Sequence, residues 1–363
     1  MIYLAYFIVG FAVVQLLVAL VNLLWGRFTY DGHEVAGTLV SVLIPARNEA
    51  NNIGNLMNDL KQQSFADIEI LVFDDQSTDG TASIVELAAQ TDTRIRIVRS
   101  EGLPEGWLGK NNACHQLAIH ALGTYYLFLD ADVRLDSDAI LHTLEYMVHH
   151  QPILMSIFPR QEMVTVGEWS TVPVMNYILL TLLPLVLVSK SRYPSLSAAN
   201  GQFMLFDAAV YRKTKPHEKL KSSRVEDIEI ARYLKREGYK IACIAADSLV
   251  YCRMYKSFRE ALNGFAKNVT HFFGNSFVLA MLFWLITTLG FVLVVWLLPF
   301  EMGVLYLVII FATRIVVAVS SGQQVLKNLL FFIPQHFALC LFIYTSYMNR
   351  QNKQMVWKDR NIS

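Results

Sequence analysis

Two aspartates end a hydrophobic run in LFLDADVRLDSD, residues 127–138, and a second pair follows them closely. Asp130 and Asp132 close a predicted buried strand, where an unpaired charge is costly. Two carboxylates at this spacing can share a hard divalent cation and leave it open to phosphate oxygens. Asp136 and Asp138 precede AILHTLEYMV, a helical pattern, so helix capping is enough to explain them. We expect the first pair, and not the second, to take part in chemistry.

Further acids follow an earlier predicted strand, in DDQSTDGT at residues 74–81. Its serine, threonine or third aspartate can cap the next helix, and its glycine suits a turn. Capping does not account for Asp74 and Asp75. Another pair, Glu226 and Asp227, stands at the predicted helix start in SRVEDIEIARYLKREGYK, where capping explains one acid of the two.

The elements that must position these acids lie between residues 36 and 270. Short apolar strands alternate there with segments whose apolar residues recur at helical spacing. We expect strands at residues 38–46, 68–75, 95–100 and 125–132, and helices within residues 47–63, 77–90 and 109–122. This alternation predicts a mostly parallel α/β sheet with helices on both faces. Ligands bind beyond the carboxyl ends of such strands, which is where the acids after the second and fourth strands would lie.

The sequence outside this region is apolar enough to cross a membrane. Hydrophobic residues make up 54% of the 363 residues and charged residues 17%, below the roughly 25% of soluble domains. Residues 1–26 carry no Asp, Glu, Lys or Arg, and residues 276–326 carry only two. Uncharged apolar runs of about 20 residues can span the hydrocarbon core. We expect an N-terminal transmembrane anchor at 1–26 and about three membrane segments within 276–348, near residues 276–298, 302–320 and 329–348.

The membrane segments leave two points open. The N-terminal run could be a cleaved signal peptide, but it has no basic n-region and its apolar core is too long for one. Arg314, in the second C-terminal segment, must snorkel or face protein. If the middle domain is cytoplasmic, four spans put both ends outside, whereas the basic tail at 349–363 favours the inside. One C-terminal segment could therefore be re-entrant or interfacial.

Net charge and cysteine content argue against two classes of partner. The formal net charge is +1, which gives no basic field, so we expect no nucleic-acid binding. The four cysteines have no CxxC spacing, which favours reduced thiols over a disulfide or a metal site. They are Cys114, Cys243, Cys252 and Cys340.

Six motifs follow one another in a fixed order along the middle region. They are IPARNE (44–49), DDQSTDGT (74–81), GWLGKNNA (106–113), LDAD (129–132), ANGQFMLF (199–206) and the pair Glu226–Asp227. Together they resemble the inverting glycosyltransferases of family 2, which have the GT-A nucleotide-diphospho-sugar transferase fold. The N- and C-terminal membrane segments resemble the membrane-attached branch of that family. Within the branch, YCRMYKSFREALNGFAKN and the closing VWKDR are most similar to bacterial enzymes that glycosylate carotenoid- and hopanoid-like lipids.

The resemblance implies transfer of a sugar from a nucleotide-diphospho-sugar, a UDP- or GDP-sugar, to a hydroxyl of a lipid or other membrane-associated acceptor. It implies a multi-pass protein of the cell membrane whose GT-A domain, residues 36–270, is cytoplasmic. Asp132 would ligate Mg²⁺ or Mn²⁺ between the two phosphates, where the metal would neutralise the departing diphosphate. The residues expected at the nucleotide sugar are Pro45, Arg47, Glu49, Asp74, Asp75, Lys110, Asp130, Gly201 and Gln202. For Lys110, a solvated lysine at a helix start is the alternative.

The resemblance makes Asp227 the catalytic base, with Glu226 beside it. The base takes the proton from the acceptor hydroxyl as oxygen attacks the anomeric carbon, and such a base contributes about 10²–10⁴-fold. Residues 169–190 form an apolar stretch inside this domain, interrupted by Pro173 and Pro184. The stretch could be a buried core helix, but we expect a membrane-interface segment that brings a lipid acceptor to the base.

One motif of the family is absent. Processive members carry Q-x-x-R-W near the diphosphate and the acceptor, and this chain does not, which argues against polymerisation. Arg253, Arg259 and Lys267 are candidate phosphate contacts in the corresponding region. They could equally form a basic segment that meets lipid headgroups.

Three other functions are alternatives to glycosyl transfer onto a lipid. A transferase that forms a polysaccharide or cell-envelope glycan is the nearest alternative. A sugar-nucleotide pyrophosphorylase would need a Gly-rich basic loop after the first strand, which IPARNEANN lacks. A non-catalytic membrane scaffold could retain the fold, but it would have little reason to keep Asp75, Asp132 and Asp227 together.

Overall fold

The computed structural model describes residues 1–25, 35, 37–245, 248–351, 356–357 and 360–361. The chain forms two compact units. A helical unit contains residues 1–26, 161–184 and 253–363, and a sheet unit contains residues 27–160 and 185–252. The chain therefore passes from one unit to the other at residues 26–27, 160–161, 184–185 and 252–253.

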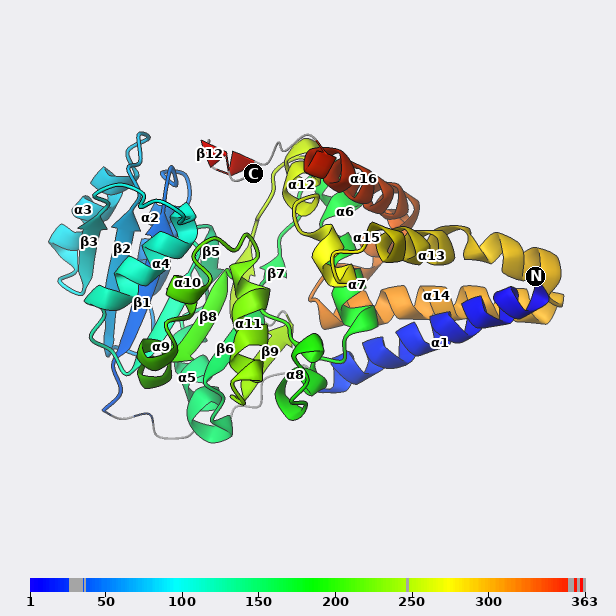
Figure 1. Ribbon diagram of the computed structural model, residues 1–363, viewed down its shortest axis with the longest axis horizontal. Helices are drawn as coiled ribbons and strands as arrows, with labels where there is room; N and C mark the ends of the chain where they lie inside the picture. The colour runs from blue at the N-terminus through cyan, green and yellow to red at the C-terminus, as the bar shows by residue number, and fades with distance from the viewer. Residues whose placement is uncertain (26–34, 36, 246–247, 352–355, 358–359, 362–363) are drawn as a thin grey trace. The chain divides into compact units, whose positions relative to one another are not determined.

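A mixed sheet of seven strands forms the centre of the sheet unit, in the order β3-β2-β1-β4-β8-β6-β9 within the described residues (Figure 1). Strand β8 is antiparallel to its neighbours β4 and β6, whereas the pairs β1–β2, β2–β3, β1–β4 and β6–β9 are parallel. The strands are β1 (Val40–Ala46), β2 (Ile68–Asp74), β3 (Ile95–Arg99), β4 (Tyr125–Leu129), β6 (Leu154–Phe158), β8 (Phe203–Asp207) and β9 (Ile241–Ala245). The predicted α/β fold with a mostly parallel sheet is confirmed.

Short strands complete the β structure. Strand β5 (Val133–Leu135) pairs antiparallel with β10 (Val250–Cys252), and β7 covers Arg160–Gln161. Within the C-terminal tail, β11 (Val356–Trp357) pairs with β12 (Arg360–Asn361). The other residues of the expected basic tail after 351 lie outside the described residues.

Helices cover both faces of the large sheet because alternate strand residues point to opposite sides. Val40, Val42 and Ile44 of β1 belong to a buried cluster that includes residues of α2 (Ile53–Lys61), α3 (Thr81–Thr91) and α5 (Ala139–His150). On the opposite face, nearer the viewer in Figure 1, lie α4 (Gly109–His120), α9 (Ala208–Thr214), α10 (Pro216–Lys219) and α11 (Glu226–Arg236). The short helices α8 (Val186–Lys190) and η1 (Pro194–Leu196) also belong to this unit.

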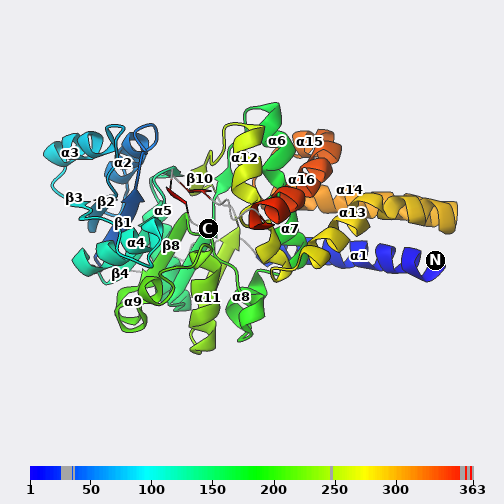
Figure 2. The same cartoon turned by 45° about the horizontal axis from the view of Figure 1, so that its top comes forward.

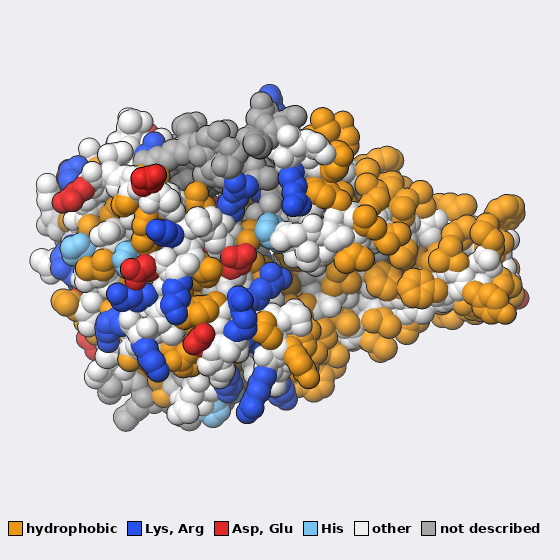
Figure 3. Space-filling view, in the orientation of Figure 1, with side chains coloured by type: hydrophobic (Ala, Val, Ile, Leu, Met, Phe, Trp, Pro, Cys, Tyr) orange, Lys and Arg blue, Asp and Glu red, His pale blue; other side chains and the backbone are white. Residues whose placement is uncertain are grey.

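Three helices of the helical unit are long and apolar enough to cross a membrane: α1 (Ile2–Trp25), α13 (Phe277–Leu297) and α14 (Phe300–Ser320). They lie side by side in both ribbon views (Figures 1 and 2). Hydrophobic side chains gather on their outer surface (Figure 3). The remaining helices are α6 (Val166–Thr171), α7 (Pro173–Leu182), α12 (Phe258–Phe265), η2 (Val269–Phe273), α15 (Val325–Leu330) and α16 (Phe332–Gln351).

The third C-terminal span expected near residues 329–348 is not one of the three candidates found among the described residues. That region is divided between the end of α15 and α16, and α16 buries the polar side chains of Gln335, His336 and Ser346. If only α1, α13 and α14 cross, the sheet unit and the C-terminal tail lie on the same side of the membrane. This arrangement would remove the conflict between the number of spans and the basic tail.

Small residues bring the three candidate spanning helices together, as is common for helices in lipid. Ala5, Ala12 and Ala19 recur every seven residues along α1 and are buried. At Gly290 of α13, an added Cβ would lie 2.8 Å from a side-chain carbon of Ile8, so this close approach requires a glycine.

The apolar stretch expected at the membrane interface, residues 169–190, is divided among the end of α6, α7 and α8, and its α7 part packs against α1 and α14. Pro173 occupies the first turn of α7, where its missing N–H costs no helical hydrogen bond. Gln15 Nε2 donates to Thr181 Oγ1 at 3.2 Å, and Asn22 Nδ2 donates to the carbonyl of Leu180 at 3.0 Å. The interface position of this segment stays a prediction, but its partners are two of the three helices that are apolar enough to span a membrane.

Two expectations concern individual side chains. All four cysteines are free, as expected, and Cys114, Cys243 and Cys252 are buried. Arg253, a candidate phosphate contact, instead donates from Nε to Oε1 of the buried Glu168 at 2.8 Å within the helical unit.

Candidate active site

The candidate site lies at the carboxyl ends of β1, β2 and β4, inside the sheet unit. Strands β2 and β3 extend the sheet from one side of β1, whereas β4 adjoins its other side. The loops that leave β1 and β4 therefore separate at a topological switch point, where open α/β sheets bind ligands. The expected acids follow these strands, so the fold collects them at one edge.

Hydrogen bonds join the loop after β1 to the loop after β2. Asn48 has a positive φ of 53°, which lets its amide face the second loop: its N–H donates to Ser77 Oγ at 3.1 Å, and its Oδ1 accepts from Thr78 N at 2.9 Å. Asp79 accepts from Ala50 N at 3.0 Å. These hydrogen bonds hold the loop after β1 against the loop after β2, so Asp79 has a structural role.

The same aspartate contacts the start of the following helix from the residue before the N-cap, Gly80, so the expected cap by Ser77, Thr78 or Asp79 is not formed. Its Oδ1 accepts from the N–H of Thr81, the first residue of α3, at 3.1 Å. Gly80 precedes that residue with a φ of 90°, a left-handed conformation that favours glycine.

Four residues expected at the nucleotide lie together on these two strand ends. Pro45, the residue before the end of β1, pairs with Phe73 of β2, and Arg47 Nη1 donates to the carbonyl of Asp75 at 2.6 Å. Asp74 and Asp75 are 6% and 3% exposed, and Asp74 Oδ1 accepts from a loop N–H at 3.3 Å. Their contact with a nucleotide stays a prediction.

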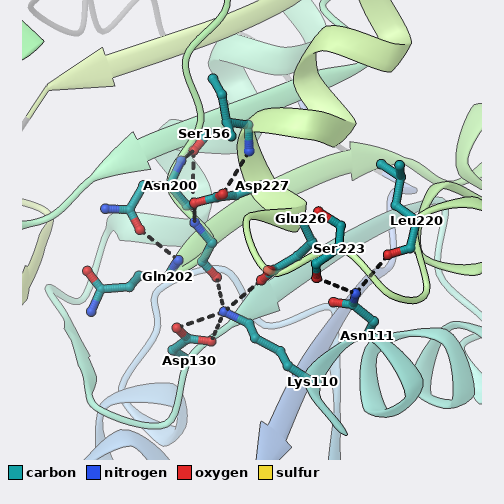
Figure 4. Close-up of polar contacts among 12 residues, drawn as sticks. Lys110, Asn111, Asp130, Ser156, Asn200, Gln202, Leu220, Ser223, Glu226 and Asp227 are labelled. Carbon is teal, nitrogen blue, oxygen red and sulfur yellow. Dashed lines mark hydrogen bonds and ion pairs between the residues drawn. The ribbon is translucent and has the colours of Figure 1, made fainter. Parts of the chain in front are cut away.

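Lys110 joins three of the other expected residues (Figure 4). From the first turn of α4, its Nζ lies 2.8 Å from Asp130 Oδ1 and 3.4 Å from Glu226 Oε1, and it donates to the carbonyl of Gly201 at 3.3 Å. Burial lowers the pKa of Lys110, but the carboxylates of Asp130 and Glu226 hold it well above its usual value. The alternative of a solvated lysine is therefore wrong.

Asp227 contacts the N–H of Gly201, whose carbonyl accepts from Lys110. Its Oδ2 accepts from the N–H of Gly201 at 3.1 Å, and its Oδ1 accepts from Ile228 N at 2.7 Å. A Cβ at position 201 would lie 2.9 Å from Lys110 Nζ and 3.6 Å from the Asp227 Cβ. A side chain at this position would therefore displace the Lys110 ammonium from its present place.

Burial raises the pKa of both acids at the start of α11. Glu226 rises to about 7, since burial outweighs the nearby Lys110 cation, and the Asp227 carboxylate adds to the rise. The pKa of Asp227 is also raised by burial, against the lowering effect of the Ile228 and Gly201 N–H groups. A buried carboxylate with a raised pKa is a stronger base than a solvated one, which suits proton abstraction.

The carboxylate expected to bind a metal lies among other acids. Burial, together with Asp130 and Glu49, raises the pKa of Asp132 to about 7, and Gln202 Nε2 donates to its Oδ1 at 3.4 Å. Repulsion between these carboxylates would be relieved by a hard divalent cation, so the residues fit one. Within the described part of the chain, no three His, Cys, Asp or Glu side chains are already placed to hold a metal ion. A metal here would need ligands from a bound diphosphate.

The sequence reasoning missed Asn111, which is buried beside Lys110. Its Nδ2 donates to the carbonyls of Leu220, Ser223 and Lys221 at 2.8, 2.9 and 3.2 Å (Figure 4). These carbonyls belong to the loop that leads into α11. Two consecutive side chains of α4 therefore hold the start of α11. Lys110 contacts the Glu226 carboxylate, and Asn111 bonds to the backbone of the preceding loop. The only sequence signal was the position of Asn111 within GWLGKNNA.

The expected capping roles need correction. Asp138 is the N-cap residue of α5 but makes no side-chain capping hydrogen bond, and Asp136 Oδ1 accepts from Asp138 N at 3.3 Å instead. At α11 the N-cap residue is Val225, so neither Glu226 nor Asp227 caps the helix. Their carboxylates contact Lys110 and Gly201, so capping of α11 does not explain the pair.

Comparisons with known proteins agree with this geometry. Residues 41–214 match the family described as Glycosyl transferase family 2. A 4,4'-diaponeurosporenoate glycosyltransferase from Staphylococcus haemolyticus (strain JCSC1435) is 26% identical over 239 residues, which is 63% of this chain and 60% of the relative. The protein of that name from Staphylococcus aureus (strain USA300) is 32% identical over 122 residues, 33% of this chain and 31% of the relative. The matches thus span less than two thirds of either relative.

A solved structure shows the fold. The mannosyltransferase PcManGT from Pyrobaculum calidifontis, in complex with GDP-Man and Mn²⁺, superposes with a TM-score of 0.61 at 16% sequence identity. The match covers 97% of this chain and 99% of that one. The expected GT-A architecture is confirmed.

Proposed function

We propose that this chain, whose residues 41–214 match the family described as Glycosyl transferase family 2, is a glycosyltransferase that transfers a sugar from a UDP- or GDP-sugar to a hydroxyl of a membrane lipid. The observation that carries the proposal is the partly buried contact between Lys110, Gly201 and the two acids that begin α11. The contact places a cation that can bind a negatively charged donor beside a carboxylate whose raised pKa suits proton abstraction from an acceptor hydroxyl.

Asp227 is the base in this proposal. Its carboxylate takes the proton of the acceptor hydroxyl while the acceptor oxygen bonds to the anomeric carbon. The bond from that carbon to the phosphate oxygen breaks in the same step, and the nucleoside diphosphate leaves with the bonding electrons. A single displacement from the opposite face inverts the anomeric configuration. The Gly201 and Ile228 N–H groups orient the carboxylate for this task.

The donor would bind along the ends of β1, β2 and β4. Asp74, Asp75, Pro45 and Arg47 form the nucleotide end of the site, on the two strand ends held together by the Arg47–Asp75 hydrogen bond. Asp130 would face the nucleotide sugar and release Lys110 to its phosphates.

Asp132, with Glu49 and Gln202 nearby, would hold Mg²⁺ or Mn²⁺. When bound there, the cation would stabilise charge on the departing diphosphate. The structural relative bound to GDP-Man and Mn²⁺ supports this choice.

A lipid acceptor is supported by two observations. The curated relatives are named for transfer to a carotenoid acid, and three helices of this chain are apolar enough to span a membrane. A membrane-bound enzyme meets its lipid substrate by diffusion in two dimensions, so attachment serves the reaction directly.

The test compares Asp227→Asn with Glu226→Gln in membranes that hold the full-length protein. Asparagine keeps the shape of the base but accepts no proton, so turnover should fall by about 10²-fold or more while donor affinity changes only a few-fold. Glu226→Gln should reduce turnover less. Radiolabelled UDP- and GDP-sugars report transfer, and calorimetry reports donor binding.

Three outcomes would change the proposal. Normal turnover in Asp227→Asn would move the base elsewhere, and Glu226 would be examined next. Loss of donor binding would make Asp227 part of the nucleotide pocket. Label in an insoluble polymer, with none in the organic phase, would replace lipid transfer with glycan synthesis.

A further inference from the structure

The three helices that are apolar enough to span a membrane share one pair of boundaries. Ile8 near the start of α1 belongs to a buried cluster with Val294 near the end of α13 and Tyr306 near the start of α14. The end of α1 therefore lies on the same side as the start of α13 and the end of α14. Because the chain passes to the sheet unit after α1, we call this side the near boundary and the adjoining half of the bilayer the near leaflet.

The short helix α15 and the long helix α16 carry apolar side chains along one outer face. Six such side chains recur at helical spacing, every three or four residues, and each is at least 40% exposed. The polar side chains of Gln335, His336 and Ser346 are buried on the inner side. A helix that faces water has the opposite arrangement, so the outer face requires apolar surroundings. The residues of the outer face are Leu326, Leu330, Ile333, Phe337, Leu341 and Tyr344.

Arg314 of α14 fixes the depth of the first turn of α16. Its Nη1 donates to Gln335 Oε1 at 2.8 Å, and its Nη2 donates to His336 Nε2 at 2.9 Å. The Arg314 side chain is 4% exposed, so it faces protein and does not snorkel. It lies six residues before α14 ends at Ser320, which is about 9 Å along the helix from the near boundary. The first turn of α16 therefore lies inside the bilayer and not on its surface.

Contacts with α13 show the direction in which α16 runs. The carbonyl of His336 accepts from Trp284 Nε1 at 2.9 Å, and His336 Nδ1 lies 2.8 Å from Thr288 Oγ1. Near the other end of α16, the ring centre of Tyr347 is 5.3 Å from that of Phe277, the first residue of α13. Both helices cover eleven residues between these two contacts, or about 16 Å. Helix α16 therefore returns along α13 to the near boundary.

Helix α16 does not reach the far boundary. The ring centre of Phe332, its first residue, is 6.0 Å from that of Phe311 on α14. Phe311 precedes the end of α14 by nine residues, so it lies about 14 Å from the near boundary. This depth is about half of the ~30 Å hydrocarbon core. In both ribbon views, the ends of α13 and α14 beside the N-terminus extend well beyond α15 and α16 (Figures 1 and 2).

We propose that residues 321–350 form a re-entrant segment, which enters the near leaflet, leaves it on the same side and binds the acyl chains of that leaflet through its outer face. Lipid is the occupant because this face continues the exposed apolar surface of α14, where Phe311 is 44% exposed and adjoins Phe332. The C-terminal tail then lies on the side to which α1 leads. All these residues belong to the helical unit, so the proposal does not rest on the glycosyl transfer.

Depth measurements on the full-length protein in phosphatidylcholine nanodiscs test the proposal. A spin label is attached to Phe337→Cys, Leu341→Cys or Tyr344→Cys, each combined with Cys340→Ser because the other three cysteines are buried. Collision rates with oxygen and with a water-soluble nickel chelate report the depth of each label. Counted from Tyr347 at 1.5 Å per residue, the labels should lie about 15, 9 and 5 Å below the near boundary.

Two control positions set the scale of these collision rates. Leu289→Cys, on the exposed side of α13, should meet oxygen only, whereas Leu87→Cys, on the exposed side of α3, should meet the nickel chelate freely. Nickel collisions at the three α16 positions as frequent as those at Leu87→Cys would overturn the lipid contact. Labels that meet neither reagent would show that protein covers the face, such as a second copy of this chain, and would also overturn it. A depth that is greatest at Leu341→Cys would show a complete span and overturn the re-entrant path.

Chemical labelling of the tail needs no change in the outer face, so it decides the path if a spin-labelled variant does not fold. In sealed membrane vesicles of one orientation, an impermeant maleimide should modify Gln351→Cys together with Leu87→Cys and should leave Glu301→Cys, at the far end of α14, unmodified. In vesicles of the reverse orientation it should modify Glu301→Cys alone. Modification of Gln351→Cys together with Glu301→Cys would place the tail on the far side and overturn the proposal.

Discussion

Asn111→Ala tests whether the first turn of α4 positions the base. The Asn111 amide has two hydrogens but lies within hydrogen-bond distance of three carbonyls, so the 3.2 Å contact to Lys221 must share a hydrogen with a shorter one. Two effective hydrogen bonds at about 0.5–1.5 kcal/mol each give a loss of about 1–3 kcal/mol. For a unit of this size, that lowers the Tm by a few degrees to about 10 °C.

The catalytic effect should exceed the effect on donor binding. The loop from Leu220 to Ser223 leads directly into α11, so its release displaces the Asp227 carboxylate, and a misplacement of about 1 Å can cost roughly 10²-fold in rate. The donor residues on β1 and β2 are held by other contacts. We therefore expect kcat to fall by about 10- to 100-fold while the donor Kd changes less than threefold.

The assay measures kcat at saturating donor, donor Kd by calorimetry, and Tm by thermal scanning. Asn112→Ala is the matched control, because Asn112 is also buried on α4 and its Oδ1 has no hydrogen-bond partner among the described residues. Asn111→Asp keeps the size but offers a carboxylate to three carbonyls, so it should be at least as damaging as alanine. A lowered Tm with unchanged kcat would refute the positioning role. Equal losses of kcat in Asn111→Ala and Asn112→Ala would do the same.

Two more predictions concern charged groups. Asp132→Ala should abolish transfer and metal-dependent nucleotide binding. Asp136→Ala loses the 3.3 Å contact to Asp138 N, so it should lower stability by about 1 kcal/mol or less and keep activity. An inactive but folded Asp136→Ala would reverse the assignment. The native state keeps a proton on Glu226 between its usual pKa of 4.5 and its raised value of about 7, so this carboxyl makes the protein less stable as pH rises through that window. Glu226→Gln should therefore lose less stability than wild type between about pH 5 and pH 8 in thermal unfolding, and equal losses would contradict the raised pKa.

The sheet and its acids could be predicted because local sequence determines them. Apolar runs that end in DDQSTDGT or LDAD indicate both the strands and the edge at which their acids meet. The burial of Lys110 could not be predicted, since a lysine at a helix start is usually solvated and only the approach of Asp130 and Glu226 reverses this. The role of Asn111 could not be predicted for another reason. It bonds to backbone carbonyls, which every residue type has, so the sequence carries no signal for these contacts.

The helical unit shows a further limit of sequence patterns. The stretch at 169–190 is apolar on all sides, so composition alone does not separate a core helix from an interface segment. Its partners, Gln15 and Asn22 of α1, lie more than 150 residues earlier in the chain. The number of spans was equally hard to predict, because α16 has the length of a span but buries polar side chains toward its neighbours.

The path of the chain between the two units has a consequence for biosynthesis. Strands β6 and β8 are neighbours in the sheet, yet the residues between them include α7, which packs against α1 and α14. During translation, both α1 and α7 are made before α14, so they can meet through Gln15 and Asn22. Helix α14 is made after the whole sheet unit. The sheet unit is therefore fully synthesised before α14, one of the two helices that pack against α7, has been made. A water-soluble form of the sheet unit requires replacement of residues 161–184 by a polar linker as well as removal of both ends, because trimming alone leaves the buried face of α7 exposed.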